Sequence, residues 1–379
     1  MRPLYLDYNA TTPIAPSVQE SMLPFLCEHY GHPASHHPLG RACHEAMEDA
    51  RSQVATLLGC RAEEIVFTSG GTESNNLALQ GLMHHEPAAA GGHLVISAIE
   101  HAAVREPARW LAHWGYEVSV VRCDRRGLIA PEAVAAALRP ETRLVSVMLA
   151  NHEIGVVQPI SEIASVCRER GIRFHTDAVQ GVGKIRTQVD ELQVDLLSLS
   201  AHKFYGPKGI GALYIREGTA LEPMLLGSGE EGGLRSGTPN IAAIVGMGKA
   251  AMLVAKCLNA SGERLAQLRN LLEDSLRKEI GDGIVVHGAG APRLPNTLCV
   301  GFPGVPAAEM LRRIPEVCAS IGAAGPSGAI PGGTLAAMGL GPDEARSSIR
   351  LSLGWQTSEE DIERAVNLIV AAWESVCVA

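Results

Sequence analysis

Short apolar segments alternate with amphipathic segments over the first 215 residues, and this alternation is the strongest constraint on the fold. Apolar residues recur at helical spacing over residues 41–58, and after Gly59 comes the short apolar run Ile65–Thr68. The same order then repeats along the chain, with predicted strands at 94–97, 118–121, 144–149, 172–176, 196–200 and 211–215 and predicted helices at 102–114, 131–138 and 160–170. Strands separated by helices imply right-handed crossovers, so the sequence predicts an α/β fold with a mainly parallel sheet.

The pattern changes near residue 250, where a long helical stretch precedes a shorter set of strands and helices. A chain of 379 residues also exceeds the size that one hydrophobic core usually supports. We therefore expect a large domain formed by residues 16–256 and a small domain formed by residues 1–15 and 257–379. The last helix of the small domain is expected to begin at a capping box over residues 358–361.

Composition narrows the class of partner and the compartment. Hydrophobic residues make up 46% of the chain and charged residues only 19%, which excludes a disordered protein. The net charge of −9 argues against nucleic acid or an anionic membrane as a partner. The cysteines show neither a C-x-x-C pair nor a zinc spacing, so we expect no metal site and a reducing compartment, the cytoplasm. No uninterrupted apolar run reaches the roughly 20 residues of a membrane span.

The segment 68–76, TSGGTESNN, lies between a predicted strand and a predicted helix. Its glycines let the backbone approach an anion closely, and the start of the helix offers free N–H groups. A phosphate could therefore bind at Gly71 and Thr72. Taken alone, a Gly-Gly turn of this kind is more often only a tight connection between a strand and a helix.

Three further strand ends contribute an acid, a lysine and a histidine. Asp177 directly follows the predicted strand at 172–176, at the edge where open α/β sheets bind ligands. Lys203 and His101 follow two other strands. Singly, these residues are more simply a turn aspartate, a solvated lysine and a structural histidine. Together they match a pyridoxal phosphate (PLP) enzyme, which needs a lysine for a Schiff base, an acid for the pyridine nitrogen, donors for the phosphate and a flat group to stack on the ring.

With these motifs in view, the chain resembles the cysteine desulfurases and selenocysteine lyases, which are fold-type I PLP enzymes of the class V aminotransferase-like group. The similarity covers essentially the whole chain and is particularly close to the selenocysteine lyase branch. It rests on segments in the family order, at 7–13, 67–76, 174–180, 200–209, 235–238 and 349–352. The resemblance implies a large domain with a mainly parallel mixed sheet and a small C-terminal α+β domain.

The resemblance also implies roles for individual residues. Lys203 is the expected Schiff-base and proton-transfer lysine, and the catalytic set is Lys203, His101 and His152. The cofactor-binding set covers the phosphate, the ring and the phenolic oxygen: Gly71, Thr72, His101, Asp177, Gln180, Ser200, His202, Lys203 and Thr238. The substrate-binding set is Asn9, Ala10, Thr11, His152 and Arg350, with Arg350 as a bidentate fork for the substrate carboxylate. Thr238 is expected to reach the phosphate of a partner subunit, so the resemblance implies a homodimer.

Three positions depart from the family pattern, at Gly325, His152 and His32, where His32 shows the same change from asparagine to histidine as His152. Family members place a mobile nucleophilic cysteine after a Gly-Ser/Ala-Ala run, but here residues 322–324 are followed by Gly325. Glycine has no nucleophile, and the nearest thiol, Cys318, is expected in a strand, so the persulfide route is in doubt. At His152 the family usually has asparagine. Histidine titrates near neutral pH and could retune the cofactor or act as an acid or base.

The leading interpretation is a PLP-dependent lyase that acts on a small L-amino acid with a leaving group at Cβ. Selenocysteine, cysteine sulfinate and cysteine are the expected substrates, and a sulfur-acceptor protein is a further expected partner. Two alternatives stay open. One is a diverged PLP enzyme that performs another β-elimination, a decarboxylation or a transamination; the other is a PLP-binding pseudoenzyme that serves as a scaffold, which the retention of Lys203, Asp177 and Arg350 disfavours.

Overall fold

A seven-stranded sheet forms the centre of the computed structural model, which describes residues 3–85, 91–321 and 333–377. The strand order is β2-β8-β7-β6-β5-β3-β4. The strands are β2 (Ile65–Thr68), β3 (His93–Ser97), β4 (Glu117–Val121), β5 (Thr142–Ser146), β6 (Arg173–Asp177), β7 (Leu196–Ser200) and β8 (Gly211–Ile215). Strand β8 runs antiparallel to β2 and β7, and the other neighbouring strands are parallel. The predicted α/β fold with a mainly parallel mixed sheet is confirmed.

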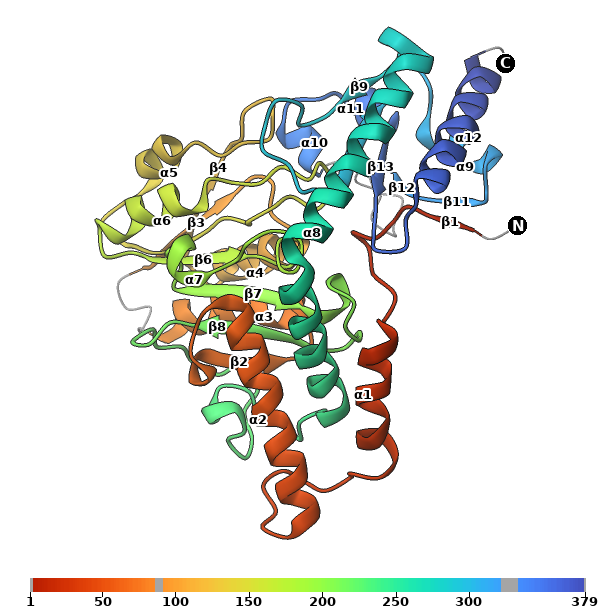
Figure 1. The fold of residues 1–379 in the computed structure, drawn as a ribbon. Coiled ribbons are helices and arrows are strands. Elements are labelled where there is room, and N and C mark those ends of the chain that lie inside the picture. The colour runs from red at the N-terminus through yellow and green to blue at the C-terminus, as the bar shows by residue number, and fades with distance from the viewer. Residues whose placement is uncertain (1–2, 86–90, 322–332, 378–379) are drawn as a thin grey trace.

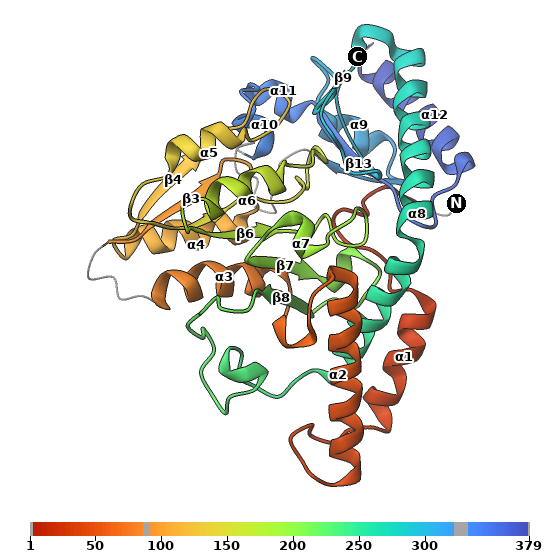
Figure 2. The same cartoon turned by 60° about the vertical axis from the view of Figure 1, so that its left-hand side comes forward.

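Helices cover both faces of this sheet because alternate strand residues point to opposite sides. Leu94 and Ile96 pack with helices α3 (Gly71–His85) and α4 (Ala102–His113) on one face. Val95, between them, belongs to the core on the other face. Figures 1 and 2 show that second face covered by α5 (Pro131–Ala137), α6 (Ile160–Arg168) and α7 (Val189–Leu192).

Helix α8 (Ile241–Ile280) is the longest element and packs against α1 (Pro16–Cys27) and α2 (Pro38–Leu58). Its Gly248 permits a close approach, because a Cβ there would lie 2.6 Å from the Cα of Ala50 in α2. By length and composition α8 could also cross a membrane. However, 56% of its most apolar window is buried inside the protein, as in a core helix.

A second hydrophobic core joins the start of the chain to its last third. Leu4 and Leu6 pack with the second half of α8 and with α12 (Glu359–Cys377). A four-stranded antiparallel sheet in the order β12-β13-β10-β9 carries much of this core. Its strands are β9 (Val285–Val286), β10 (Thr297–Gly301), β12 (Ser320–Ile321) and β13 (Ser348–Ser352), while β1 (Leu4–Tyr5) pairs with β11 (Val317–Cys318). The remaining helices are α9 (Ala307–Arg313), α10 (Thr334–Ala337) and α11 (Pro342–Arg346), with short 3₁₀ turns at Ala62–Glu64, Ala201–Lys203, Glu231–Gly233 and Gly281–Gly283.

Several local expectations can be compared with these elements. Reciprocal hydrogen bonds between Ser358 and Asp361 confirm the capping box before α12. Cys318 lies in strand β11, as expected. Helix α8 runs through the expected boundary at 256/257 and contributes to both cores, so the division into 16–256 and the rest stays a prediction. Gly325 lies outside the described residues.

Candidate active site

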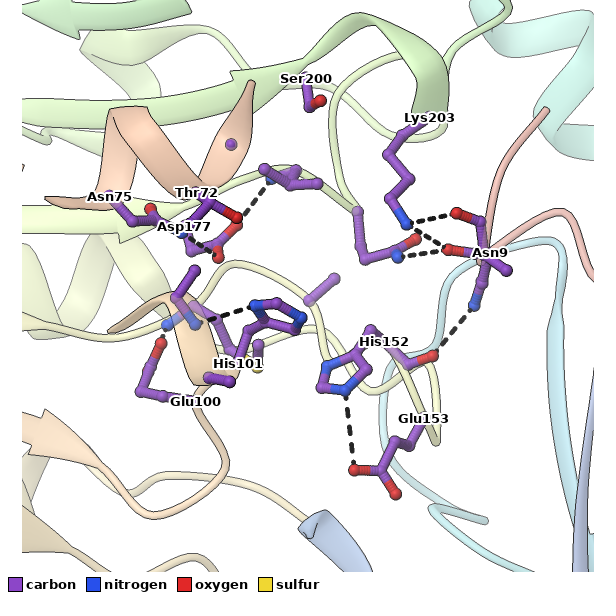
Figure 3. A pocket seen from close by; sticks show the side chains of 18 of the residues that line it. Asn9, Thr72, Asn75, Glu100, His101, His152, Glu153, Asp177, Ser200 and Lys203 are labelled. Carbon is purple, nitrogen blue, oxygen red and sulfur yellow. Dashed lines mark hydrogen bonds and ion pairs between the residues drawn. The ribbon is translucent and has the colours of Figure 1, made fainter. Parts of the chain in front are cut away.

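A cavity of about 870 Å³ lies at the carboxyl ends of the parallel strands, beside strand β13 (Figure 3). Each side chain reaches it from a different element, because polar residues follow the apolar strands at the same edge of the sheet. Of the expected site residues, those that line it are Asn9, Ala10, Gly71, Thr72, His101, His152, Asp177, Gln180, Ser200, His202, Lys203 and Arg350. The structure therefore brings together residues separated by up to 341 positions.

Lys203 ends the 3₁₀ turn after β7, and its amine points across the cavity toward the N-terminal segment (Figure 3). Its Nζ donates hydrogen bonds to the carbonyl oxygens of Asn9, at 2.7 Å, and Ala10, at 2.8 Å. Burial and the nearby Arg350 guanidinium lower the pKa of Lys203 to about 8. The amine therefore loses its proton more readily than an exposed lysine does, as a nucleophilic lysine requires.

Asp177 ends strand β6 and is almost fully buried. Asn75, from helix α3, donates a 2.7 Å hydrogen bond to its Oδ2, and the backbone N–H of Val179 donates one of 3.0 Å to its Oδ1. These two donors hold the carboxylate in one orientation at the cavity wall. The sequence reasoning missed Asn75; its only signal was its place in the segment 68–76.

The first turn of α3, at the edge of the cavity, has the geometry of an anion cradle. Gly70 has a φ of +152°, and a Cβ on Gly71 would lie 2.7 Å from Cγ2 of Val179, so bulkier residues do not fit at the second position. The first N–H groups of a helix lack intrahelical acceptors and attract anions. Thr72 and Ser200 line the same cavity with their hydroxyls.

His202 and Thr11 form a supporting pair at this end of the site. Thr11 does not line the cavity, but its Oγ1 lies 3.1 Å from Nδ1 of His202. Burial and the neighbouring Lys203 lower the pKa of His202 to about 4, so its imidazole is neutral at neutral pH. Thr238 is exposed and does not line the cavity of its own chain.

Two histidine rings meet edge to face in the cavity, with the centroids of His101 and His152 5.3 Å apart (Figure 3). Nδ1 of His101 accepts a hydrogen bond from the N–H of Ala103 at the start of α4, which fixes the ring. The pKa of His101 is lowered by burial. The pKa of His152 lies well below its ordinary value, because burial opposes its charging and so do the adjacent His101 ring and the cations Arg350 and Lys203. His152 is thus neutral at neutral pH, whereas the sequence predicts a histidine that can titrate there.

Arg350 of β13 reaches the cavity but is not an isolated fork. Its Nη2 pairs with Oδ1 of Asp7 at 2.6 Å and donates to Oγ of Ser320 at 2.8 Å. Its Nη1 donates to the carbonyl oxygen of His152 at 3.0 Å, whereas its buried Nε has no hydrogen-bond partner in the described part of the chain. Asp7 belonged to a recognised motif, but its pairing with Arg350 was not anticipated.

Glu100 is a buried acid that the sequence reasoning did not assign. Burial raises its pKa to about 8, despite hydrogen bonds from Ser97 and from the N–H of Met148. Its second carboxyl oxygen has no partner among the described residues. Glu100 therefore carries a proton at neutral pH and adds no charge to the wall of the cavity.

These features fit PLP. A lysine with a lowered pKa, an oriented carboxylate and a glycine-lined helix start are the three groups that bind its aldehyde, its pyridine nitrogen and its phosphate. All three line one cavity large enough for the cofactor and a small amino acid.

Comparisons with known proteins agree with this geometry. Residues 4–365 match the family Aminotransferase class-V. The "Cysteine desulfurase IscS" of Dictyoglomus turgidum is 43% identical over 371 residues, which cover 97% of this chain and 94% of that protein. The protein of the same description from Anaeromyxobacter sp. (strain K) is 46% identical over 370 residues, covering 97% and 91%.

Solved structures show the same fold. A "NIFS-LIKE PROTEIN" has a TM-score of 0.92 at 34% identity and covers 99% of this chain and 100% of its own. "SspA in complex with cysteine" has a TM-score of 0.82 at 36% identity, covering 92% and 98%. The chain therefore belongs to the class-V aminotransferase family and, within it, to the PLP-dependent cysteine desulfurases.

Proposed function

We propose that this enzyme is a PLP-dependent lyase that removes the β-substituent of a small L-amino acid. The observation that carries the proposal is that Lys203, Asp177 and Arg350 line one cavity. Two of these residues are the groups that hold the cofactor, and the third is the cation that suits a substrate carboxylate. Relatives described as cysteine desulfurases support the same reaction class.

Each of these residues would hold a different part of the cofactor. Lys203 would bind the cofactor covalently, Asp177 would pair with its pyridine nitrogen, and His101 would stack on the ring. The cradle at Gly71 and Thr72, with Ser200 and His202, would hold the phosphate, and Gln180 would contact the phenolic oxygen. When bound, PLP supplies an electron sink for the electrons of a bond broken at Cα.

Lys203 is also the residue suited to move the proton at Cα. Its amine, with a pKa of about 8, can accept a proton near neutral pH and give it back. The oriented Asp177 carboxylate keeps a proton on the pyridine nitrogen through a charge-assisted contact. His152 is neutral and partly buried, which favours hydrogen bonding over proton transfer as its role near pH 7.

Arg350 would bind the substrate carboxylate together with Asn9 and Ala10 from the N-terminal segment, whereas Thr11, which does not line the cavity, would support His202. Because Asp7 already neutralises part of the guanidinium charge, the substrate must compete with Asp7 or share the fork. The unpartnered Nε of Arg350 offers one further donor for that purpose. This arrangement favours small substrates that carry a free carboxylate.

The expected substrates are selenocysteine, cysteine sulfinate and cysteine. Gly325 occupies the position at which the family carries its nucleophilic cysteine. A sulfinate or a selenium group can leave without attack by a thiolate, whereas transfer of sulfur from cysteine as a persulfide needs one. We therefore place the first two substrates ahead of cysteine.

The proposal also includes the oligomeric state, a homodimer. Thr238 is exposed on a loop before α8 and away from its own cavity, as expected of a residue that serves a partner's phosphate site. Leu26, Tyr30 and Leu226 are large apolar side chains left exposed on the single chain. A subunit interface would bury such groups.

Product analysis separates this proposal from its alternatives. The purified protein should bind PLP, and borohydride should fix the cofactor to Lys203, as mapped by mass spectrometry. Each candidate amino acid is then followed by the visible spectrum and by its products. Alanine indicates removal of the β-substituent, pyruvate with ammonia indicates β-elimination, and PLP binding without turnover indicates a scaffold. Labelling at another lysine would contradict the site itself.

A further inference from the structure

Lys184 is a partly buried lysine that none of the roles above uses. It lies in the turn after β6, four residues beyond Gln180. Its Nζ donates a 2.6 Å hydrogen bond to Oε1 of Gln180 and a 3.1 Å hydrogen bond to Oδ1 of Asn9. Both partners are neutral amides, and within residues 3–85, 91–321 and 333–377 no carboxylate pairs with this amine. An amine that gives up part of its water for amide partners alone gains no ion pair in return, so the position of Lys184 calls for an explanation.

A glutamine side chain has two unlike ends, one that accepts hydrogen bonds and one that donates them. By itself, Gln180 could turn either end toward a ligand. The amine of Lys184 lies at the Oε1 end, which leaves Nε2 on the other side, where it donates to the carbonyl oxygen of Asn9 at 2.9 Å. Nε2 carries a second hydrogen, and Gln180 lines the cavity.

We propose that Lys184 is a positioning residue that fixes the amide of Gln180 so that an N–H, and not the C=O, faces the phenolic oxygen of the cofactor. The inference rests on the proposed function, because the place of Gln180 beside that oxygen is part of it. A donated N–H stabilises negative charge on the oxygen, whereas a carbonyl oxygen would repel that charge.

The same network ties Lys184 to the catalytic lysine. The carbonyl oxygen of Asn9 accepts hydrogen bonds from both Gln180 and Lys203, and Asn296 supports Oδ1 of Asn9 at 3.1 Å. Without Lys184, Oδ1 of Asn9 still accepts the hydrogen bond from Asn296. Oε1 of Gln180, in contrast, loses the hydrogen bond that Lys184 donates. The amide of Gln180 is thus held at both ends, by Asn9 at Nε2 and by Lys184 at Oε1, and it is the residue that loses one of its two holds without Lys184.

Charged groups around the network act on it as well. Burial is the main cause that lowers the pKa of Lys184. The nearby cations Lys203 and Arg350 lower it further. Asp177 and Asp7 face Lys203 and act in the opposite direction on that amine. A test of Lys184 must therefore separate the orientation of Gln180 from a direct effect of charge.

The test uses the full-length protein loaded with PLP and the variant Lys184→Met, which keeps the length of the side chain but cannot donate. The readouts are the pH midpoint of the cofactor's visible band and the dissociation constant of PLP from the apoprotein. Without the oriented N–H, the charge left on the phenolic oxygen is less stable, so the neighbouring proton is harder to remove. We expect the midpoint to rise by about one pH unit and PLP binding to weaken about tenfold.

Matched variants isolate the cause. Lys184→Arg retains donors and should stay close to the parent midpoint, and Lys256→Met, at an exposed position of α8, should not change it. Gln180→Ala should itself raise the midpoint. In that background Lys184→Met should add no further shift, because the two residues act through one hydrogen bond.

An unchanged midpoint in Lys184→Met would overturn the inference. The inference would also fail if Lys184→Met shifted the midpoint as much in the Gln180→Ala background as in the parent, because that result would indicate a direct effect of charge. If Lys184→Met does not fold, Gln180→Glu decides instead. Its carboxylate pairs with Lys184 and faces the cofactor with an acceptor, so a midpoint equal to the parent's would contradict the role. Failure of the proposed function looks different, since the parent protein would then not bind PLP at Lys203.

Discussion

The side-chain amide of Asn75 donates a 2.7 Å hydrogen bond to Oδ2 of Asp177 across a separation of 102 residues. Both side chains are buried, so water cannot replace this contact. Oδ1 of Asn75 has no partner among the described residues, which indicates that the side chain is oriented by what it donates. The acid expected to bind the pyridine nitrogen is thus aimed by a neighbour in the helix that forms the anion cradle.

Asn75→Ala should weaken cofactor binding without changing the fold. A hydrogen bond to a charged group contributes about 1.5–3 kcal/mol, so we expect at least a tenfold increase in the dissociation constant of PLP. The measurement is a titration of apoprotein with PLP. Asn76→Ala is the matched control, because Asn76 bonds within its own helix to the carbonyl oxygen of Thr72. Equal losses in the two variants would show that the contact with Asp177 is not the cause.

Asp177→Asn tests the acid itself. Without the carboxylate, the pyridine nitrogen loses its charged partner and the cofactor becomes a poorer electron sink. We expect weaker PLP binding and suppressed exchange of the substrate α-proton, followed by NMR in deuterated buffer. Exchange at the parent rate would rule out Asp177 as the partner of the ring nitrogen. Adding Asn75→Ala to this variant should cost little more, because the pair acts as a unit.

The sequence predicted the fold well because its strands are short apolar runs that end in polar residues. Lys203, Asp177 and His101 each follow such a run, and the structure places all three around one cavity. The pairing of Arg350 with Asp7 was not predictable in the same way, because the two residues lie 343 positions apart and meet only through the second core.

The neutral state of His152 was missed for a related physical reason. A pKa depends on burial and on nearby charges, and the cations that surround His152 come from distant segments. No local pattern in the sequence reports that environment. The same limit applies to Glu100, whose pKa is raised by burial first and then by the nearby Asp177 carboxylate.

His175 should make the stability of the protein depend on pH. It is fully buried in β6 between the hydroxyls of Ser146 and Ser198, and burial lowers its pKa to about 3. In the unfolded chain this histidine takes up a proton near pH 6.5, whereas in the folded chain it does so only near pH 3. The free energy of unfolding therefore decreases as the pH is lowered from 6.5 to 3.

Urea unfolding of the apoprotein at pH 7 and pH 5 measures this effect. The parent should be less stable at pH 5, and His175→Gln should show a smaller difference between the two pH values. His113→Gln, at an exposed position of α4, should keep the parent's difference. Other histidines with lowered pKa values, such as His202, will leave part of the dependence in place. An identical difference in parent and His175→Gln would exclude His175 as a contributor.

The last prediction concerns Gly325, the residue that the sequence resemblance aligns with the family's nucleophilic cysteine. Transfer of sulfur from L-cysteine needs a thiolate that attacks the substrate sulfur, and glycine provides none. We therefore expect little alanine from L-cysteine and no persulfide on the parent protein, while cysteine sulfinate still yields alanine, because its β-group leaves without a thiolate. Gly325→Cys should add cysteine-dependent alanine production and a persulfide at residue 325, and Gly325→Ser is the matched control that adds a side chain without a thiol. Mass spectrometry after incubation with L-cysteine locates any persulfide. Robust alanine production from L-cysteine by the parent, with persulfide on Cys318 or another native thiol, would show that this enzyme has moved its nucleophile rather than lost it.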